Sequence, residues 1–366
     1  MNTKRLCSLF AVTTILAVST FIFTACSGGG ADAPASQPGR PALEKTDINI
    51  GHLNSTAHLL AFVAAEEGFF KEEGLNATLS QFASSVELVS GLEGDKLDVS
   101  LIGSVPTLTF QSQGHGISVF GGAMTNGHGY VIKAKYVEGL KDWDINVLKG
   151  RNVASVKNSM QDVELLVLLK NAGIEIGKGP QKVNVVYFDS QKDAYAALQG
   201  AEIDAASVYS PYASLATEAG YKVVYYCNTQ EEFKNQPCCR QVALTTALAQ
   251  RPNTYQAIER ALIKAYKFSQ ENHPKTIEDV AKYIDIDHKL IEYEVYGGHS
   301  TSHPDPDRIA TASLKDEIVK LGYAQDYNIA PLYNTDVYAK ALDSLAAEFP
   351  EDKTYQDLKT HFAEAN

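Results

Sequence analysis

The chain has 366 residues, of which 45% are hydrophobic and 21% are charged. That length gives room for two domains, and the composition excludes a disordered or collagen-like chain. With 44 acidic residues against 32 basic ones the formal net charge is −12, so the protein's field repels phosphate backbones and we expect no nucleic acid partner.

The N-terminus has the features of an export signal. Two basic residues near the start precede an apolar run over 6–23. The run is long enough to be weighed as a membrane anchor, but a polar tether rich in Gly and Pro follows over 26–46. Small residues before Cys26 make the segment similar to a bacterial lipoprotein signal, although Phe23 stands where that pattern usually has Leu. The resemblance implies that 1–25 are removed and Cys26 is lipidated; an uncleaved anchor and an ordinary secretory signal are the alternatives.

From residue 47 the chain alternates β-rich runs with helical periodicity. The first round predicts strands over 48–53, 75–81 and 98–102 and helices over 57–73 and 86–92. The second round, after residue 150, predicts strands over 152–156, 183–188 and 204–208, a helix over 159–172, and a helix capped by Ser190 that ends at Gly200. This alternation predicts an α/β fold in which each of two lobes has a mostly parallel sheet flanked by helices.

The C-terminal part is mostly helical in its periodicity. Helices are expected over 254–271, 274–284, 287–296, 306–321 and 335–349. A strand over 241–246 precedes them and is well placed to return the chain to the first lobe. We therefore expect lobe 1 to combine 47–133 with 238–366, and lobe 2 to span 134–237.

Four segments in chain order resemble the solute-binding proteins of ABC importers for nitrate, sulfonates, taurine and thiamine-pyrimidine precursors, a family that also includes the pyrimidine synthases. They lie at 64–75, 94–106, 148–154 and 200–206. The resemblance implies a type II periplasmic-binding-protein fold with the ligand between the lobes. A two-lobe fold agrees with the two rounds of alternating strands and helices. A ligand between the lobes agrees with the general rule that ligands bind outside the carboxyl ends of strands.

Lobe 1 is expected to contribute three polar loops to the ligand site. The first opens a helix, where backbone N–H groups and hydroxyls can hold an anionic oxygen, although the same residues would serve equally well as a helix cap. The resemblance implies that the other two loops also face the ligand. The candidates are Asn54, Ser55, Thr56, His58, Ser84, Ser85, Gly103 and Ser104.

Lobe 2 is expected to contribute a helix start and the residues after a strand. The candidates are Lys157, Asn158, Ser159, Tyr209 and Ser210. An aromatic ring at a cleft can stack on a planar ligand, but ordinary packing is the alternative for Tyr209. Ser210 stands where many relatives have Glu, which disfavours a ligand whose cationic group needs that acid.

Two adjacent cysteines, Cys238 and Cys239, precede the strand that returns to lobe 1. The two cysteines align by position with a cysteine-rich stretch of the pyrimidine synthases. That stretch contains more cysteines than the two present in this chain. Plain packing at a hinge, a disulfide with Cys227 and a soft metal site remain open, and no companion histidine motif supports the metal. The guanidinium of Arg240 could bind a carboxylate, sulfonate or phosphate through two hydrogen bonds, or form a salt bridge.

The expected function is that of a lipid-anchored, extracytoplasmic solute-binding protein on the periplasmic side or the cell surface. We expect a monomer that captures a sulfonate, nitrate or thiamine-pyrimidine precursor and delivers it to an ABC permease with its ATPase. We expect no catalytic residues, metal or cofactor. The alternatives are a synthase-like enzyme that uses iron with cysteine, and a binding lipoprotein without a permease.

Overall fold

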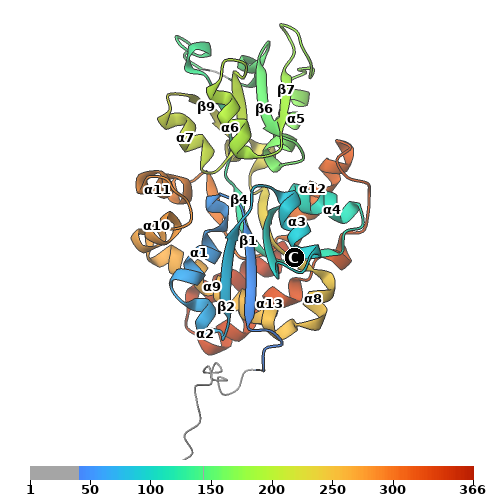
Figure 1. Ribbon diagram of the computed structural model, residues 1–366, viewed down its shortest axis with the longest axis vertical. Coiled ribbons are helices and arrows are strands. Elements are labelled where there is room, and N and C mark those ends of the chain that lie inside the picture. The colour runs from blue at the N-terminus through green and yellow to red at the C-terminus, as the bar shows by residue number, and fades with distance from the viewer. Residues whose placement is uncertain (1–40, 143) are drawn as a thin grey trace, which may run out of the picture. The chain divides into compact units, whose positions relative to one another are not determined.

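The computed structural model describes residues 41–142 and 144–366 (Figure 1). The predicted signal, the lipidation site Cys26 and most of the tether lie outside the described residues. Within the described ranges, no helix combines the length and apolar character needed to cross a membrane.

The first sheet has six strands in the order β11-β4-β10-β3-β1-β2. Its strands are β1 (Asp47–His52), β2 (Asn76–Gln81), β3 (Val99–Gly103), β4 (Ile117–Asn126), β10 (Pro237–Leu244) and β11 (Ser300–Ser302). β1 is parallel to β2 and β3, whereas β10 is antiparallel to β3 and β4. The expected return of the chain to this sheet is therefore confirmed, although the strand ends at Leu244 and residues 245–246, which were expected to belong to it, begin a helix.

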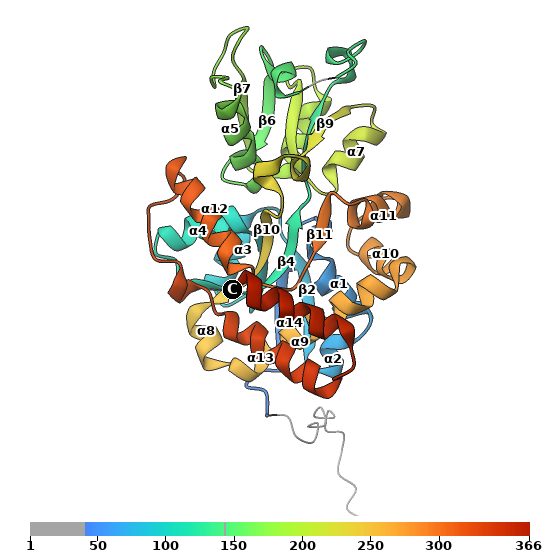
Figure 2. The same ribbon diagram turned by 180° about the vertical axis from the view of Figure 1, so that it is seen from behind.

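Two layers of helices cover this sheet because its strands alternate their side chains between two faces. Leu101 packs with α1 and α9, whereas its neighbour Ile102 packs with α3 on the other face. α13 and α14 pack on the far side of α9 (Figure 2). The helices are α1 (Leu59–Glu66), α2 (Phe69–Glu72), α3 (Ser85–Glu93), α4 (Ser104–Ser112), α8 (Thr245–Gln250), α9 (Pro252–Glu271), α10 (His273–Ala281), α11 (His288–Tyr296), α12 (Arg308–Lys320), α13 (Thr335–Glu348) and α14 (Lys353–Ala365).

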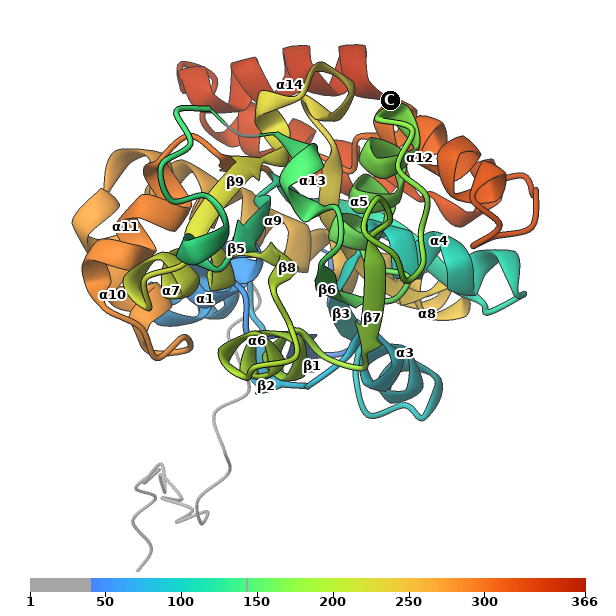
Figure 3. The same cartoon turned by 90° about the horizontal axis from the view of Figure 1, so that it is seen from above.

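The second sheet has five strands in the order β7-β6-β8-β5-β9 (Figure 3). Val153 and Ala154 of β6 point to opposite faces, into separate cores formed with α5 and α6. Ser190 caps α6 as predicted, since its hydroxyl accepts a hydrogen bond from the backbone N–H of Asp193. The elements are β5 (His128–Ile132), β6 (Asn152–Val156), β7 (Asn184–Phe188), β8 (Ala205–Tyr209), β9 (Lys222–Tyr226), α5 (Met160–Asn171), α6 (Gln191–Gln199) and α7 (Tyr212–Glu218).

Two expectations about the sheets need correction. Both sheets are mixed rather than mostly parallel. The chain passes between the sheets through β4 to β5 and through β9 to β10, and these four strands form antiparallel pairs. The expected lobe 1 range of 47–133 also includes β5, which pairs within the second sheet. We infer that the chain changes sheets at Asn126 and Gly127, whose positive φ angles of 60° and 85° form the turn between β4 and β5.

Candidate binding site

A pocket lies between the two sheets and is lined from both. The first sheet and its loops supply Leu53, Ser55, His58, Ser85, Gly103, Pro106, Cys238 and Cys239; the second supplies His128, Ser159, Met160, Gln161 and Tyr209. The cavity measures about 50 Å³. A single water needs roughly 10–15 Å³ on the same measure, so this conformation has room for a few water-sized groups.

Eight of the expected site residues line this pocket, namely Ser55, His58, Ser85, Gly103, Ser159, Tyr209, Cys238 and Cys239. The sequence prediction missed Leu53, Pro106, His128, Met160 and Gln161. His128 lies between two glycines, yet it is the first residue of β5 and is 1% exposed. The flanking glycines do not indicate that His128 is buried. Its imidazole is buried because β5 lies between β8 and β9 in the sheet, which is a tertiary feature that the local sequence does not reveal.

The other expected residues lie outside the pocket lining. The Ser84 hydroxyl caps α3 by accepting a hydrogen bond from the N–H of Glu87. Lys157 stands over the ring of Tyr187, with its Nζ 5.9 Å from the centroid. Asn54, Thr56, Ser104, Asn158, Ser210 and Arg240 are likewise not among the lining residues.

Hydrogen bonds from two places join the two sides of the pocket. The Ser55 hydroxyl donates to the carbonyl of Ser210 at 2.9 Å, and Thr56 and Ser210 also share a hydrogen bond through their hydroxyls. On the α4 side, the hydroxyl of Thr109 donates to Oδ1 of Asn158 at 2.7 Å. These hydrogen bonds indicate a closed arrangement of the two sides. Several residues that were expected to contact the ligand, including Ser55, Thr56 and Asn158, instead bond across the pocket.

A second group of contacts joins α5 to the region after α12. The phenol of Tyr323 donates to Oδ2 of Asp162 at 2.6 Å, and Met160 and Val163 pack with Leu314 in a shared apolar cluster. Burial raises the pKa of Asp162 against the lowering effect of the Tyr323 hydrogen bond. The closed arrangement therefore combines apolar packing with a buried, hydrogen-bonded carboxyl group.

Two thiols and an imidazole meet on the pocket wall. The Sγ atoms of Cys238 and Cys239 are 3.3 Å apart, and Nε2 of His128 is 3.0 Å from Sγ of Cys238. Nδ1 of His128 is 3.2 Å from Oε1 of Glu164, which is fully buried. These two cysteines and Cys227 are free thiols, so the structure does not contain the disulfide considered from the sequence.

The two neighbouring thiols have different acidities. The hydrogen bond with Cys238, helped by the nearby imidazoles of His58 and His128, lowers the pKa of the Cys239 thiol well below its usual value. The same hydrogen bond and burial raise the pKa of Cys238.

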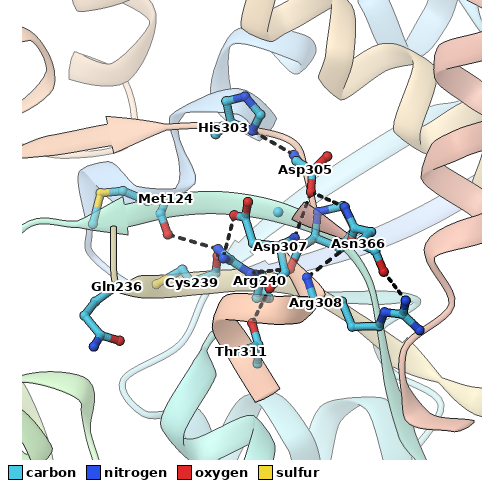
Figure 4. Close-up of polar contacts among 12 residues, drawn as sticks. Met124, Gln236, Cys239, Arg240, His303, Asp305, Asp307, Arg308, Thr311 and Asn366 are labelled. Atoms are coloured by element: carbon cyan, nitrogen blue, oxygen red, sulfur yellow. Dashed lines mark hydrogen bonds and ion pairs between the residues drawn. The ribbon is translucent and has the colours of Figure 1, made fainter. Parts of the chain in front are cut away.

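Arg240 does not line the pocket in this conformation, in contrast to the expectation that its guanidinium contacts the ligand. Figure 4 shows this side chain among backbone carbonyls and an acidic partner. It donates to the carbonyls of Pro306, Met124 and Cys239, and its Nη2 is 2.8 Å from Oδ2 of Asp307. Arg240 is 1% exposed, so its ion pair with Asp307 is a buried one and not the interlobe or surface salt bridge considered as the alternative.

The same region contains a group of possible metal ligands, Asp305, Asp307 and His361, whose ligand atoms lie within 4.8 Å of one another. Both carboxylate oxygens of Asp307 are already engaged, by Arg240 and by Nε2 of His361 at 2.9 Å. Oδ1 of Asp305 accepts hydrogen bonds from the N–H of Asp307 and from Nδ2 of Asn366. The cluster therefore serves to fix Arg240 and the C-terminus (Figure 4).

Comparison with known proteins identifies relatives of this chain. A model of the NMT1-like family matches residues 41–285. A Bacillus subtilis (strain 168) protein named for binding aliphatic sulfonates is 25% identical over 288 residues, which are 76% of this chain and 80% of that protein.

Solved structures show the same fold. The nitrate-binding protein NrtA from Synechocystis PCC 6803 matches with a TM-score of 0.71 and 15% identity over 83% of this chain and 90% of NrtA. The alkanesulfonate-binding protein SsuA from Xanthomonas axonopodis pv. citri matches with a TM-score of 0.66 and 17% identity over 80% of this chain and 99% of SsuA. The fold is therefore the two-lobe periplasmic-binding-protein fold. The desulfurization enzyme DSZB shares it at a TM-score of 0.60 and 13% identity over 82% of this chain and 99% of that chain, so the fold alone does not separate carriers from enzymes.

Proposed function

This chain belongs to the NMT1-like family, and on that premise we propose that it is the solute-binding component of an ABC importer. The observation that carries the proposal is the pocket between the two sheets, whose lining comes from both sides. A solute that contacts both sides favours the closed form over the open one, which is how a binding protein signals that it is loaded.

The proposed solute is a small sulfonate or nitrate, with a thiamine-pyrimidine precursor as the planar alternative. The hydroxyl of Ser85 and the second N–H of the Gln161 amide line the pocket and can donate hydrogen bonds to oxyanion oxygens. The hydroxyls of Ser55 and Ser159 also belong to the lining, but in this conformation they donate to the carbonyls of Ser210 and Val156. The cavity of about 50 Å³ favours the smallest members of these classes in the closed form. The monomer then delivers the solute to its permease and ATPase without chemical change.

Binding is tested with the full chain, solubilised in mild detergent, against a panel of sulfonates, nitrate and pyrimidines. A solute present at 100 times its Kd stabilises the folded state by about 2.7 kcal/mol, which a thermal-shift assay detects easily. X-ray scattering should show compaction with the same solute. Absence of both responses over the whole panel would reject the proposed solute classes.

Two neighbouring serines give a matched pair of variants for the site. Ser85 lines the pocket, whereas Ser84 caps α3 and does not. We expect Ser85→Ala to weaken solute binding with little change in stability. Ser84→Ala should cost about 1 kcal/mol of stability through the lost cap, with unchanged affinity. The reverse pattern would show that the solute binds elsewhere.

The proposed lipid anchor has its own test. Cys26→Ser should abolish incorporation of labelled fatty acid and move the protein from the membrane fraction to the soluble extracytoplasmic fraction. Retention in the membrane without labelling would favour an uncleaved anchor over 6–23. Export with normal processing and no labelling of the unaltered chain would favour an ordinary secretory signal.

A further inference from the structure

Helix α7 follows Pro211, whose side chain has no atom that could cap it. The first N–H groups of a helix have no acceptor within the helix, so the residue before it usually supplies one. Two other helices of the second sheet follow this rule, because the hydroxyl of Ser159 caps α5 and that of Ser190 caps α6. The acceptor for α7 therefore has to come from another part of the molecule.

That acceptor is Glu294, a fully buried residue of α11. Its Oε1 accepts a hydrogen bond from the backbone N–H of Ser214 at 3.2 Å and another from the Ser214 hydroxyl. α11 packs with the helices of the first sheet, through Ile291, and lies on the same flank of the molecule as α7 (Figure 2). A helix of the second sheet is thus capped by a carboxylate from the side of the first sheet.

The second oxygen of this carboxylate is held by His299. Nε2 of His299 lies 3.0 Å from Oε2 of Glu294, and the imidazole stacks on the ring of Tyr226 in β9, with centroids 4.3 Å apart. Burial raises the pKa of Glu294, but the hydrogen bond from His299, helped by the hydroxyls of Ser210 and Ser214, lowers it further, so the pKa lies below its ordinary value. The carboxylate is therefore charged at neutral pH and fixed from both sides.

The segment that Glu294 caps also reaches the pocket. Residues 209–214 run from the end of β8 into α7. Tyr209 lines the pocket, and the carbonyl of Ser210 accepts the hydrogen bond from Ser55, which lines the pocket from the other side. Glu294 is not among the lining residues. It can therefore act on a solute only through the segment that it holds.

We propose that Glu294 is a positioning residue for solute capture: it caps α7 from the opposite side and so holds the segment 209–214 closed over the pocket. Its effect on capture rests on the proposed function, whereas the cap itself forms between residues of the protein. When the two sides separate, the buried carboxylate and the N–H of Ser214 lose a charge-assisted hydrogen bond, which has a net cost. The cap therefore favours the closed form and slows the release of solute more than its entry.

The cap is tested without solute, by hydrogen–deuterium exchange of the full chain in mild detergent. In Glu294→Ala the amides of residues 212–218 should exchange about tenfold faster, because hydrogen bonds to charged groups contribute this much or more. Glu294→Gln keeps an oxygen that can accept from Ser214 and should restore most of the protection. Lys289→Ala is the matched control, since it removes an exposed ion pair between the same two helices, with Glu218 at 3.6 Å.

Capture is tested by stopped-flow kinetics with methanesulfonate and nitrate as the probes. For a probe that binds the unaltered chain, Glu294→Ala should raise the dissociation rate about tenfold and change the association rate by less than about threefold. Lys289→Ala should leave both rates unchanged. A residue that only stabilised the fold would not produce this separation of the two rates.

Circular dichroism of each variant separates loss of the cap from loss of the fold. Equal exchange of residues 212–218 in Glu294→Ala and the unaltered chain, or a Glu294→Gln protein that exchanges as fast as Glu294→Ala, would overturn the cap. Faster exchange with an unchanged dissociation rate would overturn the role of Glu294 in capture. Failure of both probes to bind the unaltered chain would instead count against the proposed solute classes, and the exchange experiment would still decide the cap.

Discussion

Replacing Arg240 by Met tests whether this guanidinium supports the fold or binds the solute. The side chain is 1% exposed, donates to three backbone carbonyls and pairs with Asp307. Removing one member of a buried ion pair costs about 3–5 kcal/mol, because the other charge remains buried. In the variant His361 still contacts Asp307, which reduces the destabilisation. The three backbone carbonyls lose their hydrogen-bond donor, which increases the destabilisation. We expect the free energy of unfolding to fall by about 3–5 kcal/mol.

The assay is urea denaturation of the full chain, followed by far-ultraviolet circular dichroism at neutral pH. Arg251→Met is the matched control. Arg251 pairs with Asp98, which also keeps an ion pair with Lys45 at 2.6 Å. The control should therefore lose only about 1 kcal/mol or less, as is usual for a partly exposed pair.

Solute binding provides the second readout. If Arg240 is structural, the variant that remains folded should bind solute with nearly unchanged affinity, because the guanidinium is not part of the pocket lining. A stable Arg240→Met protein that no longer binds solute would refute this reasoning. It would show that Arg240 reaches the ligand in another conformation of the lobes.

Three further predictions follow from buried contacts. Burial lowers the pKa of His52 to about 4, below its ordinary 6.5, so the unfolded chain binds more protons between these values. Stability should fall by up to about 3 kcal/mol as the pH drops from 6.5 to 4, and by less in His52→Gln. Tyr323→Phe removes a hydrogen bond between α5 and the region after α12, and should weaken solute binding about tenfold and expand the protein in solution scattering. Gly122→Ala would place a Cβ 1.9 Å from the backbone carbonyl oxygen of Asp305 and should cost at least about 1–3 kcal/mol, whereas Gly116→Ala, with open space, should change stability little.

Each of these expectations has a contrary result. An equal acid sensitivity in His52→Gln and the unaltered chain would assign the pH dependence to other groups. Tyr323→Phe with unchanged scattering and affinity would mean that apolar packing alone holds the closed form. Equal stability of the two glycine variants would show that the backbone around β4 yields readily to the added methyl group.

Local patterns in the sequence were sufficient to predict most of the strands and helices of the two sheets. The alternation that predicted strands over 152–156 and 204–208 corresponds to β6 and to most of β8, because side chains on opposite faces of a strand must both be buried under helices. Ser190 was recognisable as a cap from its spacing to Asp193. The predicted elements did not include α4. Its Pro106 falls in the first turn of the helix, where the missing N–H is not needed.

Sequence patterns alone predicted the two-round α/β plan and pointed to the polar loops after its strands as the place for a ligand. The tertiary structure decided which side chains of those loops reach the pocket. Arg240 and Cys239 are adjacent in the chain, yet one is held by Asp307 and the other lines the pocket with Cys238 and His128. No local rule could separate them, because the outcome depends on register shifts between β10 and β4 and on partners more than sixty residues away.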